Sequence, residues 1–242
     1  MNCALPEDAL DQSLTGLEIT PSSSLLAQLA DGLHAMAQPL TVLRGALGAL
    51  QLWDRAAAAE RQRYVEMSAT QTERLCDIMC CLRSLVDAAQ IEAVCAPVDL
   101  QELVASVVED FAVVCHSSDL RIVVSSSDGC MQVFADRART EQALRSALKT
   151  IAAVSVRGDE IQLQILSDGG FVGFVLQNGR KHRKSLGSGD RLELSLAEAS
   201  VRSQQGGFEF SENPFRISIR LPMASLELTN VDVTSDCFET AV

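Results

Sequence analysis

Residues 22–53 read SSSLLAQLADGLHAMAQPLTVLRGALGALQLW. In this stretch apolar side chains recur at alternating spacings of three and four residues, a pattern typical of a helix that packs against other helices. Ser22 or Ser23 is a suitable N-cap, so we expect one long helix that runs to about Trp53. The apolar seam of this helix consists of Leu26, Leu29, Leu33, Met36, Leu40, Leu43, Leu47 and Leu50.

His34 directly follows a residue of this seam and precedes Pro39 by five positions. We therefore expect its imidazole at the flank of a helical bundle, accessible to solvent. A proline inside a helix removes one backbone hydrogen bond and clashes with the carbonyl group four residues earlier, here that of Ala35. An accessible imidazole on a loosened turn is suited to carrying a phosphoryl group. The alternative is a surface histidine near a harmless kink.

A second amphipathic stretch extends from about Glu60 to Ala93, after a short connection at residues 54–59. Two long helices joined by a short link form a helical hairpin. One hairpin cannot bury two apolar seams by itself, so we expect a homodimer in which two hairpins form a four-helix bundle. The apolar face of the second helix consists of Tyr64, Leu75, Ile78, Leu82, Leu85 and Ala89.

From Pro97 onward, short strand-like runs alternate with helical ones. Asp99 is a suitable N-cap for a helix that runs to about Cys115, and Asp168-Gly169-Gly170 is a strong hairpin turn signal. We expect further helices at 137–156 and 191–204, and strands at 121–125, 131–135, 161–166, 171–177, 208–211 and 215–221. This order predicts a mixed sheet with helices over one face, an α/β sandwich.

The predicted fold class is therefore α+β, with a helical hairpin followed by an α/β sandwich. The predicted segments are a flexible N-terminal tail at 1–21, the hairpin at 22–94, the sandwich at 97–223 and an acidic C-terminal tail at 224–242.

The composition excludes several functional classes. A net charge of −12 argues against nucleic acid as a partner, because binding there depends on neutralising phosphates. No apolar run approaches the roughly 18 to 20 residues that span a bilayer, and residues 1–17 carry no Lys or Arg, so we expect a cytoplasmic protein that does not bind membranes. Eight cysteines in such a chain indicate thiols rather than disulfides. No Cys-x-x-Cys pair or Cys/His ligand set is present, so no metal is expected.

The order of elements resembles the core of a bacterial sensor histidine kinase, in which a dimerising phosphoacceptor hairpin precedes a Bergerat-type ATP-binding domain. In that family the phosphoacceptor motif is His, an acidic residue, two variable residues, a polar residue, Pro and Leu. His34, Gln38, Pro39 and Leu40 match it in register, and Ala35 takes the acidic position. Weaker family motifs follow in the right order at 97–100, 135–137, 141–144, 187–189, 206–207 and 219–222.

The resemblance also implies a nucleotide site, and this chain departs from it. Thr150 stands where the family has the asparagine that ligates Mg²⁺. The adenine-reading motif Asp-x-Gly-x-Gly corresponds to residues 177–181, in which Gln177 replaces the aspartate, Gly179 is kept and Lys181 replaces the second glycine. Lysine at that place removes the backbone freedom of glycine. We therefore expect a degenerate ATPase-like domain that binds no nucleotide cofactor.

Ala35 bears on the reaction separately. Kinases of this family use the adjacent carboxylate as a general base for the histidine, which alanine cannot replace. Transfer between histidine and a response-regulator aspartate requires less of the histidine side, because the regulator supplies Mg²⁺ and an acidic pocket. In this respect the chain is similar to the dimeric histidine phosphotransferases that derive from histidine kinases.

Four hypotheses follow. The first is a histidine phosphotransferase with His34 as phosphocarrier and a response-regulator receiver domain as partner. The second is a non-catalytic module that binds a response regulator or pairs with a true histidine kinase. The third is a response-regulator phosphatase in which Gln38 positions water or contacts the receiver, and the fourth is an active but divergent kinase. The basic run at 180–184 is either a site for an acidic partner or a solvated loop, and the acidic tail either binds a partner or is solvated.

Overall fold

The computed structural model describes residues 21–52, 58–127, 131–178 and 185–224. Both predicted tails lie almost entirely outside these ranges, as do Trp53, Gly179, Lys181 and the whole basic run. Within the described ranges, no helix has the length and apolar character that crossing a membrane requires.

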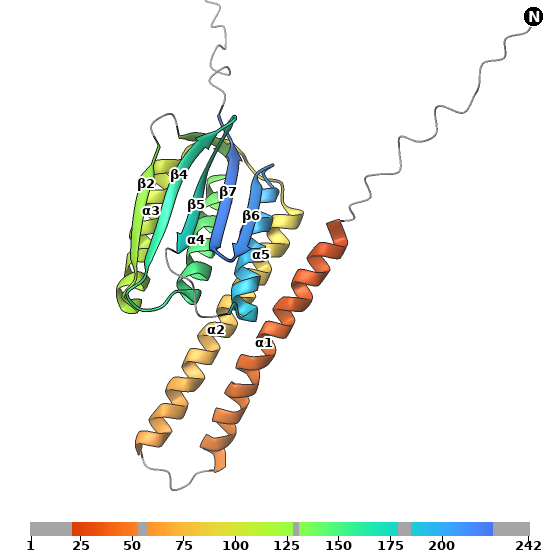
Figure 1. The fold of residues 1–242 in the computed structure, drawn as a ribbon. Coiled ribbons are helices and arrows are strands. Elements are labelled where there is room, and N and C mark those ends of the chain that lie inside the picture. Colours follow the sequence, from red (N-terminus) through yellow and green to blue (C-terminus); the bar gives the residue numbers. More distant parts are fainter. Residues whose placement is uncertain (1–20, 53–57, 128–130, 179–184, 225–242) are drawn as a thin grey trace, which may run out of the picture.

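Two long antiparallel helices, α1 (Pro21–Leu52) and α2 (Ala58–Gln90), form the predicted hairpin and extend well beyond the rest of the molecule (Figure 1). Helix α1 continues through Pro39 without a break. The helices approach closely at Gly32, where a Cβ atom would come within 2.2 Å of the Leu82 side chain. The absence of a side chain at this position therefore sets the spacing of the hairpin.

The second half of the chain is a two-layer sandwich. Its elements are β1 (Ala96–Asp99), α3 (Leu100–Ser118), β2 (Arg121–Ser126), β3 (Gln132–Ala135), α4 (Arg137–Val154), β4 (Glu160–Asp168), β5 (Phe171–Asn178), α5 (Ser188–Arg202), β6 (Gly207–Glu212) and β7 (Phe215–Pro222). A five-stranded sheet has the strand order β2-β4-β5-β7-β6, in which β2 and β4 are parallel and the other neighbours antiparallel. Helices α3, α4 and α5 cover one face of this sheet (Figure 1).

Local sequence signals explain where these elements begin and end. The Asp99 carboxylate accepts hydrogen bonds from the backbone N–H groups of Gln101 and Glu102, at 2.9 and 3.0 Å, and so caps α3 as predicted. Gly169 and Gly170 have φ values of 56° and 88° in the turn between β4 and β5, a conformation that favours glycine. The mixed sheet and its helical cover confirm the predicted sandwich.

The structure differs from the prediction at one edge. Strand β3 does not join the large sheet but pairs with β1 in a separate two-stranded sheet, with Pro97 opposite Phe134. Strand β1 has only four residues, and proline cannot donate to a ladder, so its sequence carries little strand signal.

Helix α5 joins the two halves of the molecule, because it contacts both α1 and α2. The junction has an apolar core of its own, separate from the core of the sandwich. We call it the junction cluster; its buried members are Ala35, Ile78, Cys81, Leu85, Leu192 and Leu196.

The connection between hairpin and sandwich is tied to the start of α4. Arg139 donates to the carbonyl oxygens of Ala88, at 3.3 Å, and Ile91 at the end of α2. The Asp136 carboxylate accepts from the backbone N–H of Val94 at 3.0 Å. The orientation of the two halves is therefore held by both apolar packing and hydrogen bonds.

Candidate functional site

His34 is exposed on α1, as its position beside the leucine seam predicts. A cavity of about 420 Å³ adjoins it, and Gln38 one turn further along α1 borders the same cavity. The opposite side is formed by Ser188, the first residue of α5. The structure thus brings both predicted site residues of the hairpin together and adds the hydroxyl group of Ser188 from the sandwich.

Ala35 points away from this cavity, into the junction cluster, and only 2% of its surface is exposed. Sequence reasoning treats Ala35 only as a missing carboxylate, whereas the structure gives it a packing role against α5. A signal for this role is present in the sequence. Gly32, Ala35, Pro39 and Ala46 recur at helical spacing and are all buried, which marks a stripe of small residues along α1.

The face of α4 that corresponds to the metal-binding face of the family that the sequence resembles forms hydrogen bonds within the protein itself. The Thr150 hydroxyl is fully buried and donates to the Ser146 carbonyl at 2.8 Å. The Ser146 hydroxyl in turn donates to the Glu193 carboxylate of α5 at 2.5 Å, and Gln142 donates to Ser146 at 3.1 Å. Lys149 forms an ion pair with the other Glu193 oxygen at 3.1 Å.

The side chains at the end of β5 are also hydrogen-bonded to other residues of the protein. The Gln177 amide donates to the Gln162 side chain on the neighbouring strand at 2.9 Å. The buried Asn178 amide donates to the Ser155 hydroxyl at 2.9 Å and to the Asp159 carboxylate at 3.1 Å. Gly179 and Lys181, the remaining predicted positions of this motif, lie outside the described residues.

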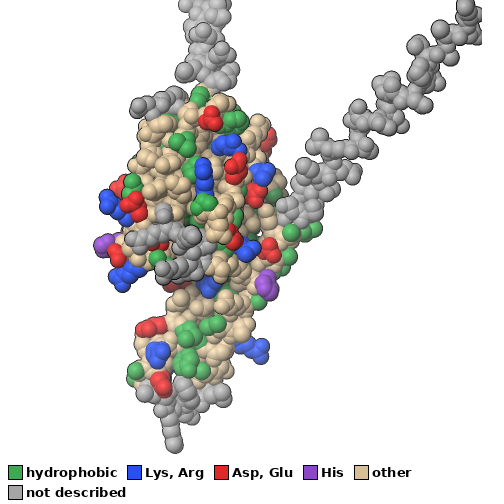
Figure 2. Space-filling view, viewed as in Figure 1, with side chains coloured by type: hydrophobic (Ala, Val, Ile, Leu, Met, Phe, Trp, Pro, Cys, Tyr) green, Lys and Arg blue, Asp and Glu red, His purple; other side chains and the backbone are tan. Residues whose placement is uncertain are grey.

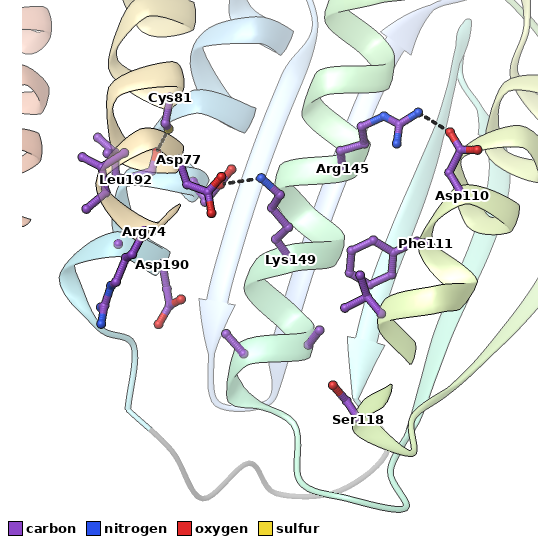
Figure 3. Close-up of a pocket in the computed structure, with 16 residues that line it drawn as sticks. Arg74, Asp77, Cys81, Asp110, Phe111, Ser118, Arg145, Lys149, Asp190 and Leu192 are labelled. Carbon is purple, nitrogen blue, oxygen red and sulfur yellow. Dashed lines mark hydrogen bonds and ion pairs between the residues drawn. The ribbon is translucent and has the colours of Figure 1, made fainter. Parts of the chain in front are cut away.

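An open cleft of about 690 Å³ lies where α2, α3, α4 and α5 meet (Figure 3). Arg145 and Asp110 point toward one another and form an ion pair at 2.6 Å. Because Lys149 is also paired, two of the three basic side chains that line the cleft already face a carboxylate. The third, Arg74 of α2, lies near the start of α5.

Cys81 lies at the boundary between this cleft and the junction cluster. Its thiol donates to the Leu192 carbonyl at 3.7 Å. Burial, and to a smaller extent the charge of Glu193, raises the pKa of Cys81 to about 12. The thiol is therefore neutral at physiological pH and acts as a small apolar group between the two halves.

Family models and curated proteins give no match to this chain, but solved structures do. The histidine kinase AdeS of Acinetobacter baumannii matches with a TM-score of 0.62 and 18% identity, over 79% of this chain and 98% of that one. Full-length ShkA in complex with AMPPNP matches with a TM-score of 0.56 and 18% identity, over 86% of this chain and 47% of that one. At these identities the likeness establishes the fold, which is that of a sensor histidine kinase core.

Proposed function

We propose that this chain is a two-component signalling protein that relays phosphoryl groups to or from response-regulator aspartates through His34, without binding ATP. The observation that carries the proposal is the contrast between two neighbouring residues. His34 is exposed beside an open cavity, whereas the Ala35 side chain is buried in the junction cluster. The hairpin keeps the histidine, but the residue that directly follows it has no carboxylate to serve as a general base.

The hydrogen bonds of the sandwich support the absence of nucleotide chemistry. The Thr150 side chain is fully buried, so its hydroxyl oxygen is not accessible to a Mg²⁺ ion. The Glu193 carboxylate reaches the same face of α4, where it would repel the phosphates of a nucleotide. The residues of this chain therefore do not fit ATP with Mg²⁺, and no step of the proposed mechanism involves it.

In the proposed transfer, the hairpin has to hold His34 in place and leave its imidazole accessible to the receiver. The unprotonated imidazole nitrogen of His34 attacks the phosphorus of the receiver's aspartyl phosphate. The N–P bond forms, the P–O bond to the aspartate breaks, and the carboxylate leaves with the electron pair. Because the receiver supplies Mg²⁺ and its own acidic pocket, this step depends less on a carboxylate beside the histidine than autophosphorylation does. Gln38 and Ser188 border the same cavity, and in this proposal they contact the receiver or the phosphoryl group.

The surface of the hairpin supports a homodimer. Alternate members of the leucine seam of α1 recur every seven residues and remain between 46% and 66% exposed, although they are large and apolar. Figure 2 shows hydrophobic side chains at the surface of the hairpin, on the part that extends away from the sandwich. A second hairpin would cover this exposed stripe in a four-helix bundle. The stripe consists of Leu26, Leu33, Leu40 and Leu47.

The second candidate function is a non-catalytic module that sequesters a response regulator or binds a histidine kinase. One observation favours it: the start of α5 borders the cavity of His34, so the sandwich narrows access to the imidazole from that side.

Incubation with phosphorylated receiver domains separates these functions. Phosphotransfer predicts that the label moves to this chain, sequestration predicts that it stays on a tightly bound receiver, and a phosphatase releases it as inorganic phosphate. A His34→Ala variant should fold normally, because the exposed imidazole contributes little packing, and should accept no label. Transfer to this variant would overturn the proposal.

A further inference from the structure

We propose that Cys76, Met79 and Cys80 form a binding site for the soft monovalent ion Cu(I) on the exposed side of α2. The site is independent of His34 and of the phosphotransfer proposal.

Cys76 has both of the other sulfur-bearing side chains as neighbours on the helix surface. Side chains three and four positions apart lie close together, with about 5–6 Å between Cβ atoms; Met79 follows Cys76 by three positions and Cys80 follows it by four. Helix α2 is continuous over 33 residues, so the spacing is fixed. Both cysteines are exposed thiols, and 58% of Met79 is exposed.

Cys81, the residue after Cys80, shows that the exposure of a thiol depends on the face of α2 on which it lies. Cys81 is 5% exposed and donates to the Leu192 carbonyl in the junction cluster. Cys76 and Cys80 lie outside that cluster, with their thiols open to solvent. Cys81 therefore serves as a matched control one residue away.

The set of donors selects the metal. Among the described residues no three His, Cys, Asp or Glu side chains come together, so a four-coordinate zinc site is not formed. Thiolate and thioether sulfurs favour Cu(I), which is satisfied by two or three ligands. On binding, Cys76 and Cys80 each lose a proton and form a Cu–S bond, while the neutral Met79 sulfur adds a third donor. The resulting complex carries a charge of −1.

The guanidinium group of Arg83 stands three residues after Cys80 on the same side of α2, where it offsets this negative charge. Its existing partner is Asp87, at 3.9 Å, and the Arg83 side chain is 86% exposed. A contact this long between solvated groups is weak, so the guanidinium is able to reorient toward the thiolates.

The test is a competition between the reduced, full-length chain and the Cu(I) chelator bicinchoninate under anaerobic conditions. We expect the chain to withhold one equivalent of Cu(I) per chain. Cys76→Ser or Cys80→Ser should each abolish this equivalent, and Met79→Leu should weaken it. Cys81→Ser should leave it unchanged. Each variant is made in a background with serine at positions 3, 130 and 237. This background removes the three thiols that lie outside the described residues.

Circular dichroism of each variant establishes that the helices are intact, which exposed Cys→Ser changes should not disturb. The proposal is overturned if the chain withholds no Cu(I), or if the Cys76→Ser/Cys80→Ser double variant still withholds one equivalent. A stoichiometry of one ion per two chains would also contradict it, because the site would then lie between helices of different chains. Equal retention of Zn²⁺ would overturn the assignment of the metal.

Discussion

Substitution of Ala35 by aspartate tests whether the packing role of this position outweighs the catalytic role that its place in the motif suggests. Ala35 is 2% exposed, and the other buried members of the junction cluster carry no positive charge. An uncompensated buried charge costs about 3–5 kcal/mol. Domains of this kind have a total stability of about 5–15 kcal/mol, so the change should loosen or separate the hairpin and the sandwich. It should not produce autophosphorylation.

Urea unfolding followed by circular dichroism measures this loss. With a urea m value of about 3 kcal/mol/M, a loss of 3 kcal/mol lowers the midpoint by about 1 M. The loss should be smaller at pH 5 than at pH 8, because burial favours the neutral form of the introduced carboxyl group. Ala37→Asp is the matched control, since Ala37 lies two residues further along α1 and is exposed. If Ala35→Asp is as stable as this control, or incorporates phosphate from ATP, the packing argument is refuted.

Four further outcomes are expected. Calorimetry with ATP and Mg²⁺ should detect no binding with a dissociation constant below about 1 mM. The variant Thr150→Asn should not restore ATP binding. A micromolar dissociation constant for the wild type would favour the divergent kinase instead. Leu33→Glu should dissociate the homodimer without unfolding the hairpin, as light scattering would show, whereas a wild-type chain that is a folded monomer at micromolar concentration would exclude the dimer. Iodoacetamide at pH 8 should modify Cys80 but not Cys81 in the native protein. Because burial raises the pKa of Cys81 to about 12, its contribution to stability is complete below pH 9 and is lost as the pH rises toward 12; a flat unfolding midpoint over that range would contradict this.

Much of the sandwich could be predicted from the sequence, because its signals are local. The side chain of Asp99 caps the helix that follows it within three residues, and the Gly169-Gly170 turn fixes its own hairpin. The pairing of β1 with β3 could not be predicted in this way. Residues 96–99 become a strand only because β3, more than thirty positions later, lies beside them.

The candidate site also has features that the sequence predicts and features that depend on contacts between distant segments. Exposure of His34 followed from its place next to the leucine seam, which is a property of one helix. The burial of Ala35 and the contribution of Ser188 depend on α5 docking against the hairpin, a contact between segments about 150 residues apart. Helical periodicity describes which face is apolar but not which partner covers it, so the sequence of α1 alone does not show that Ala35 packs against α5.

The central claim is that His34 takes its phosphoryl group from a receiver and not from ATP. The most direct measurement follows acid-labile, base-stable phosphate on the wild-type chain and on His34→Ala, with either labelled ATP and Mg²⁺ or a labelled phosphorylated receiver as donor. Our account predicts label on the wild type from the receiver alone, and none on His34→Ala from either donor. Label from ATP on the wild type, or transfer from the receiver to His34→Ala, would contradict it.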